Sequence, residues 1–183
     1  MRSSKTASEP CGVPLPPPDP VIVEVSPSIV EQAQTLANEM GAIRNSILSG
    51  RGNLAGFIGE VVVADLLGVK TSNTFDYDLV LGDGRTVDVK TKQTSRAPLV
   101  SYDASVAAAS GHQKCDLYVF TRLLRENERM VMYVMGWIPR ADFYLEATPL
   151  KAGWIDASNG WTVSVDCYNL AYEKMNNIRQ LMP

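Results

Sequence analysis

The sequence predicts an α/β (α+β) fold in which a central mixed β-sheet is flanked by helices. Two segments near the N-terminus, 27–49 and 53–67, repeat apolar residues at helical spacing. Two β-branched and aromatic runs, 115–124 and 130–138, are separated by a charged turn and indicate a hairpin. Helix-like and strand-like segments are interspersed along the rest of the chain, as expected for a sheet covered by helices.

Local signals set the expected element boundaries. Ser26 and Pro27 form a good helix start, because serine caps the first turn and proline suits the first helical position. Glycine at position 68 ends the second helix. The other elements that we expect are strands at 74–81 and 85–92, a short helix at 104–109, a helix from Pro139, a strand at 161–166 and a closing helix at 169–181.

Length and composition predict one domain, 21–183, after a Pro-rich extended or disordered tail, 1–20. The net charge of −3 argues against a protein that coats nucleic acid through bulk charge.

Three cysteines without a C-x-x-C pair favour a reducing, cytoplasmic setting. No apolar run is long enough to span a bilayer, so we expect no membrane partner. The oligomeric state is left open, a homo-oligomer included.

The stretch "FDYDLVLGDGRTVDVKTK" places charges where a sheet is expected to be dry. If Gly82-Asp83-Gly84 is a three-residue loop, Leu81 opposes Arg85, and Asp78 opposes Asp88 on the same face. A two-residue Asp83-Gly84 turn would instead put the two acids on opposite faces. The register therefore decides whether the two carboxylates meet.

Two opposed carboxylates repel each other, and burial increases the cost. Either one carboxyl group holds a proton, or a cation lies between them. Glu60, on the preceding helix between small residues, supplies a third acid, and Lys90 projects from the same face as Asp88. Converging oxygen ligands of this kind suit Mg²⁺ or Mn²⁺.

This combination resembles the PD-(D/E)XK nuclease superfamily. The matching features are the glutamate of "GFIGE", Asp78 in "DYDLV", and "DVK", in the superfamily's order of helix-Glu, strand-Asp, turn and strand-Asp-x-Lys. Tyr77 stands where the superfamily's name has proline. From about residue 42 to 143 the chain looks like small phage-encoded members of the superfamily.

The resemblance implies a restriction-endonuclease-like core and metal-dependent hydrolysis of phosphodiester bonds in nucleic acid, DNA ahead of RNA, in the host cytoplasm if the protein is phage-encoded. It implies that Glu60, Asp78, Asp88 and the backbone carbonyl of Val89 hold Mg²⁺ (or Mn²⁺), and that Lys90 positions the attacking water. It also implies a further role in catalysis for Gln93. Basic residues cluster in sequence around the motif and are candidates for phosphate contacts: Arg44, Arg51, Lys92 and Arg96.

The resemblance leaves two questions open. It does not distinguish an endonuclease from an exonuclease. The competing hypothesis is a catalytically inactive nucleic-acid-binding or virion-associated protein that keeps the nuclease fold.

Overall fold

The computed structural model describes residues 19–40, 53–72, 74 and 76–183, and their strands form two sheets. The larger sheet has the order β1-β6-β5-β3-β2, with β1 Val21–Glu24, β2 Leu79–Val80, β3 Thr86–Thr94, β5 Leu117–Glu126 and β6 Arg129–Pro139. The smaller sheet has the order β4-β8-β7, with β4 Asp103–Ala107, β7 Thr148–Leu150 and β8 Cys167–Ala171.

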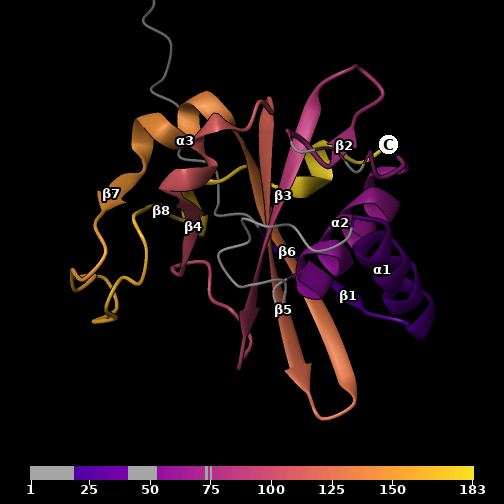
Figure 1. Ribbon diagram of the computed structural model, residues 1–183, viewed down its shortest axis with the longest axis horizontal. Coiled ribbons are helices and arrows are strands. Elements are labelled where there is room, and N and C mark those ends of the chain that lie inside the picture. The colour runs from indigo at the N-terminus through magenta and orange to yellow at the C-terminus, as the bar shows by residue number, and fades with distance from the viewer. Residues whose placement is uncertain (1–18, 41–52, 73, 75) are drawn as a thin grey trace, which may run out of the picture.

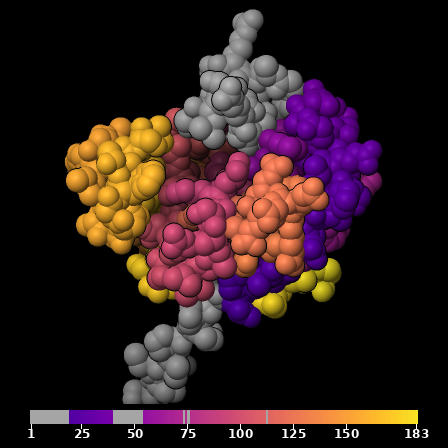
Figure 2. Space-filling model, turned by 90° about the horizontal axis from the view of Figure 1, so that it is seen from below, coloured from indigo at the N-terminus to yellow at the C-terminus, as the bar shows by residue number. Residues whose placement is uncertain are grey.

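The large sheet lies between two different layers (Figure 1). Helices α1, Pro27–Met40, and α2, Asn53–Leu67, cover one face. Helix α3, Arg140–Glu146, and the small sheet cover the other, and in Figure 2 the orange and yellow β7–β8 region lies opposite the indigo helices. Strands β3 and β5 are parallel and the other pairs antiparallel, so the predicted mixed sheet flanked by helices is confirmed.

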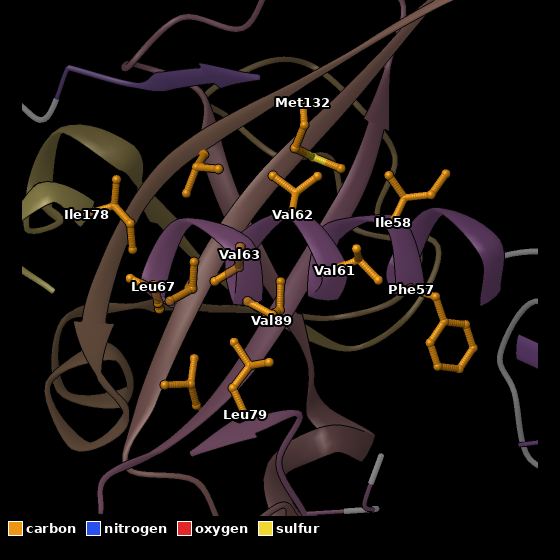
Figure 3. Close-up of a cluster of buried hydrophobic side chains, with 14 of the residues drawn as sticks. Phe57, Ile58, Val61, Val62, Val63, Leu67, Leu79, Val89, Met132 and Ile178 are labelled. Atoms are coloured by element: carbon orange, nitrogen blue, oxygen red, sulfur yellow. The ribbon is translucent and has the colours of Figure 1, made fainter. Parts of the chain in front are cut away.

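Each face of the large sheet builds its own core, because neighbouring residues of a strand point to opposite faces. On β5, Leu117 and Val119 pack toward α1 and α2, whereas Tyr118 and Phe120 pack toward α3 and the small sheet. Figure 3 shows the first of these clusters, in which side chains of α2 lie against Val89 and other strand residues. Each fully buried aliphatic side chain stabilises the fold by about 1.5–3 kcal/mol.

The predicted start of α1 and the predicted end of α2 are confirmed. The Ile29 amide donates a hydrogen bond of 3.3 Å to Ser26 Oγ, which confirms the cap of α1. Gly68 takes a positive φ of 65° directly after α2, as a terminating glycine does. The expected extension of α1 through 41–49 lies outside the described residues, as do positions 1–18 of the predicted tail.

Three predicted elements are wrong. Residues 103–107 form strand β4 rather than a helix, and the 3-10 helix η1, Ala108–His112, follows them. The run at 161–166 contributes only an isolated bridge between Ile155 and Thr162, and the late strand is β8. The expected closing helix is instead β8 followed by two 3-10 helices, η2 Tyr172–Lys174 and η3 Ile178–Gln180.

The helices predicted at 104–109 and 169–181 are wrong for the same reason. Ala104 and Val106 are buried in β4, and Leu170 and Tyr172 are buried in and just after β8. That is a period of two, which belongs to a strand, and it outweighs the helix propensity of alanine because β4 and β8 pair with each other.

Two further differences concern the large sheet. Strand β1 was not predicted; it is short and pairs with β6 at the sheet edge. The predicted strand 74–81 shrinks to the two residues of β2, whereas 85–92 is confirmed as β3 with small shifts of its ends.

No helix among the described residues is both long and apolar enough to cross a membrane.

Helix α2 approaches β3 closely at Gly59. A Cβ atom added there would overlap Thr91 Oγ1 and lie 3.1 Å from Thr121 Oγ1. These two hydroxyls are hydrogen-bonded to each other at 2.9 Å, so neither is free to turn away without losing a partner. Gly59 therefore sets the distance between α2 and the sheet, and with it the position of the next residue, Glu60.

We expect Gly59→Ala to lower the free energy of unfolding by about 1–3 kcal/mol, because the new methyl group forces α2 away from β3. Gly56→Ala is the matched control on the same helix, because a Cβ at position 56 meets no atom within 4 Å in the part of the chain that the structure describes. Alanine has less conformational freedom than glycine to lose on folding. Gly56→Ala should therefore raise the free energy of unfolding by about 0.5–1 kcal/mol. Urea unfolding followed by circular dichroism measures both, and equal effects of the two substitutions would contradict the close packing at Gly59.

Candidate active site

The hairpin between β2 and β3 has the register that the three-residue loop predicts. Leu79 lies opposite Val87, and the Leu81 amide donates to the Arg85 carbonyl at 2.8 Å. Gly84 takes the positive φ, 89°, that such a loop places on glycine. The alternative of a two-residue turn is therefore wrong.

Beyond this hairpin one edge of β3 is open. Among the described residues β2 pairs with β3 only at Val87 and Thr86, so β3 continues to Thr94 with a strand neighbour, β5, on one side only. Alternate residues of a strand direct their backbone groups to the same edge. Because Val87 and Val89 bond toward the β2 side, the Val89 carbonyl also faces this open edge.

Asp78 closes the first part of the edge with its side chain. Its backbone amide donates to the Val87 carbonyl at 2.8 Å, and its carboxylate Oδ2 accepts a hydrogen bond of 2.7 Å from the Val89 amide. The carboxylate thus takes the place of a strand carbonyl where β2 has ended. These contacts support Asp78 rather than its neighbour Asp76 as the acid of this site.

Asp88 and Lys90 lie on the face of β3 that is turned away from α2. Asp88 is 2% exposed, and its Oδ2 lies 2.7 Å from Lys90 Nζ. Lys90 Nζ and Asp88 Oδ2 form an ion pair but not a hydrogen bond, because their relative orientation does not suit one. Asp88 Oδ2 therefore accepts no hydrogen bond among the described residues. Lys90 Nζ donates instead to Gln113 Oε1 at 2.7 Å and lies 5.9 Å from the centre of the Tyr118 ring.

Glu60 reaches the same edge from α2, on the opposite face of the sheet. Its pKa is raised from the ordinary 4.5 to about 7, first by burial and then by the negative charge of Asp88, whereas Lys90 opposes the rise. Burial likewise raises the pKa of Asp78 well above its usual value, with contributions from Glu60 and Asp88, whereas the Val89 amide and Lys90 lower it. The three acids therefore share one electrostatic environment.

The donor set suits a hard divalent cation. Three mutually repelling carboxylates, one of them with a buried oxygen that accepts no hydrogen bond, fit the oxygen-rich sites of Mg²⁺ and Mn²⁺. However, the described residues contain no group of three or more acidic, histidine or cysteine side chains in an arrangement ready to hold a metal ion. The acids are instead engaged with the Val89 amide and with Lys90, so we expect them to reorient when a cation binds.

A cleft of about 240 Å³ continues from this site around the open edge of β3. Its walls come from the start of α2, from β3 and from the small-sheet side, and they include Gly56, Lys90, Lys92, Ser105 and Tyr172. Polar and positively charged groups therefore lead away from the acids.

The remaining predicted site residues are spread along and beyond β3. Lys92 lines the cleft, whereas Gln93 is exposed on the face of Val89 and Thr91. Arg96 is exposed in the loop after β3, where its carbonyl accepts a hydrogen bond of 2.8 Å from Thr94 Oγ1. Arg44 and Arg51 lie outside the described residues.

The sequence reasoning missed Gln113, Ser105 and Tyr172. Gln113 follows η1 and is 23 positions from Lys90, with no spacing that relates the two. Ser105 and Tyr172 belong to segments that were predicted to be helical, so their side chains were expected to face elsewhere. The alternation of buried residues in these segments was the one signal that would have placed them on strands.

Comparison with known proteins adds no relative. No model of a known protein family matches the chain, and no curated protein matches it either. The nuclease resemblance therefore rests on the motifs quoted above.

The raised pKa values predict that the folded protein becomes less stable as pH rises. The folded state holds a proton on Glu60 up to about pH 7, whereas the unfolded chain releases it near 4.5, so ionisation costs stability between these values and the cost persists above them. Without added metal, we expect the urea midpoint to fall from about pH 5 to about pH 8.

Glu60→Gln isolates the contribution of this residue, because its side chain keeps nearly the same shape without a titrating proton. The fall in the midpoint should be smaller in this variant, with the remainder coming from Asp78. Identical pH profiles for the wild-type protein and Glu60→Gln would contradict the burial of Glu60 among like charges.

Proposed function

We propose that the protein is a metal-dependent nuclease that hydrolyses phosphodiester bonds in nucleic acid, with DNA as its substrate ahead of RNA. The observation that carries the proposal is the gathering of Glu60, Asp78 and Asp88 with Lys90 at the open edge of β3. Buried, mutually repelling acids in a cleft are typical of functional sites, because packing alone does not favour them. Their order along the chain is that of the PD-(D/E)XK superfamily, which supports a restriction-endonuclease-like core.

Each chain residue has a chemical role in this proposal. Glu60, Asp78, Asp88 and the Val89 carbonyl would hold Mg²⁺ or Mn²⁺, which lowers the pKa of a bound water and stabilises negative charge on the phosphate. Lys90 carries the positive charge that neutralises the scissile phosphate and orients the water. Gln113 Oε1 and Asp88 Oδ2 each lie 2.7 Å from Lys90 Nζ, so Gln113 acts as a positioning residue for the ammonium.

Nucleic acid is the substrate class that matches the surroundings of the acids. The cleft next to them presents Lys90, Lys92 and hydroxyl groups, which bind phosphates, although the whole chain is acidic. The similarity to small phage-encoded proteins favours a role in a bacteriophage, in the host cytoplasm.

The alternative is a nucleic-acid-binding protein, virion-associated or not, that keeps the fold without catalysis. One observation favours it: the described acids are not in a metal-ready arrangement, and Asp88 is already paired with Lys90. The two functions differ in whether bound nucleic acid is cut.

Cleavage assays test the proposal. Linear, circular and single-stranded DNA, and RNA, are incubated with the full-length protein in Mg²⁺, in Mn²⁺ and in EDTA. We expect cleavage of at least one substrate that EDTA abolishes, and a loss of rate of about 10²-fold or more in Asp88→Asn and Lys90→Met. Cleavage of the circular substrate would identify an endonuclease.

Asp78→Asn and Asp76→Asn form a matched pair of isosteric variants two residues apart. An asparagine oxygen at position 78 still accepts the Val89 hydrogen bond, so the hairpin should be retained while the charge is lost. We expect the first variant to lose activity like Asp88→Asn and the second to stay within about threefold of the wild-type rate. Binding without cleavage by the wild-type protein under every condition would instead establish the inactive alternative.

A further inference from the structure

The cleft beside the acids contains more positive charge than its protein neighbours neutralise. Lys92 and Arg122 are direct neighbours across the parallel pair β3–β5. Arg122 is 7% exposed, donates from Nε to the Tyr172 hydroxyl and from Nη2 to the Asp103 carbonyl, both at 2.8 Å, and forms no ion pair among the described residues. Like charges side by side repel, and a buried guanidinium normally pairs with a carboxylate.

The nearest acids compensate only in part. Asp103 and Asp156 act on Lys92 with an attraction that is weaker than the opposing effects of burial and of Arg122, so the pKa of Lys92 is lowered. Both carboxylates also lie within hydrogen-bond distance of the Ser158 hydroxyl, which donates its one proton to either of them. An anion in the cleft would supply the missing negative charge.

Gly56 keeps the other wall of the cleft open. It lies in helix α2, where alanine would be more stable by up to about 1 kcal/mol, and a Cβ there would meet no atom of the described residues within 4 Å. Neither packing nor a positive φ requires glycine at this position. A side chain at position 56 would enter the cleft.

We propose that this cleft is a phosphate-binding subsite that holds one sugar–phosphate unit of a DNA strand beside the candidate active site. Lys92 contacts the phosphate, Arg122 supports it electrostatically through Tyr172, to which it is hydrogen-bonded, and Ser105 lines the cleft from the small-sheet side. The volume of about 240 Å³ lies below the ~300–1,000 Å³ of sites for whole small-molecule ligands, which fits one repeat of a longer strand. The inference rests on the proposed function for the identity of its ligand.

Binding measured in EDTA tests the subsite apart from catalysis. The probe is a fluorescently labelled single-stranded DNA oligonucleotide, followed by anisotropy, with the blunt duplex and an RNA of the same sequence as comparisons. Gly56→Leu should weaken DNA binding by about tenfold or more, because the leucine side chain fills the cleft. Gly82→Leu is the matched control: its Cβ also meets nothing within 4 Å, but position 82 does not line the cleft, so binding should stay within about twofold.

The salt dependence gives a second, independent readout. If Lys92 contacts a phosphate, the slope of log K against log salt for single-stranded DNA should be smaller by about 0.7 in Lys92→Met than in the wild-type protein. A purely structural role for Lys92 would change the melting temperature rather than this slope. Thermal unfolding of each variant confirms that it is folded, and we expect Gly56→Leu to be at least as stable as the wild-type protein.

The outcomes separate the subsite from the nuclease proposal. Binding by wild-type protein that Gly56→Leu weakens supports the subsite, and the subsite stands if no cleavage is found in any metal. Binding that is unchanged in Gly56→Leu and in Lys92→Met overturns the subsite even if DNA is cut. No binding of DNA by the wild-type protein also overturns it, and preferential binding of RNA would change the strand that it holds.

Discussion

The packing of α2 against β3 at Gly59 is the constraint on which the rest of the structure depends. Because this residue has no side chain, the helix lies directly on the hydroxyl pair of Thr91 and Thr121. The close approach buries the valines that follow on α2 and completes the core on that face of the sheet. It also carries Glu60 to the edge of β3, where the acids of the other segments are found. The same contact therefore serves the stability of the fold and the composition of the site.

The site itself gathers like charges that oppose one another. Three carboxylates are held near one another in a partly buried setting, and the response of the chain is to raise the pKa of Glu60 and Asp78 and to pair Asp88 with Lys90. Natural sequences keep such conflicts where function requires them, since well-packed apolar residues would give a more stable edge. A retained proton on Glu60 or Asp78 relieves the repulsion, and under the proposed function a bound cation would do the same.

The small sheet β4-β8-β7 covers one face of the large sheet and also forms one wall of the cleft. Its strands and η2 place Ser105 and Tyr172 opposite the start of α2, so the open edge of β3 becomes a cleft rather than a flat rim. Arg122 is buried between the two sheets, against the rings of Tyr102 and Tyr172. This layer therefore determines the charge and width of the path that leads to the acids.

The sequence by itself determined the features that depend on neighbours in the chain: the start of α1, the end of α2, the hairpin of β5 and β6, and the three-residue loop that sets the register before Asp88. The pattern of charges in the sequence also singled out Glu60, Asp78, Asp88 and Lys90, whose role in catalysis stays a prediction. Only the tertiary structure decided that residues 103–107 and 167–171 are strands, because each is stabilised by pairing with the other across more than sixty positions. It alone decided that β2 begins only at Leu79 and that Gln113 accepts a hydrogen bond from Lys90, since both depend on which distant segments meet at the edge of β3 and not on any local preference.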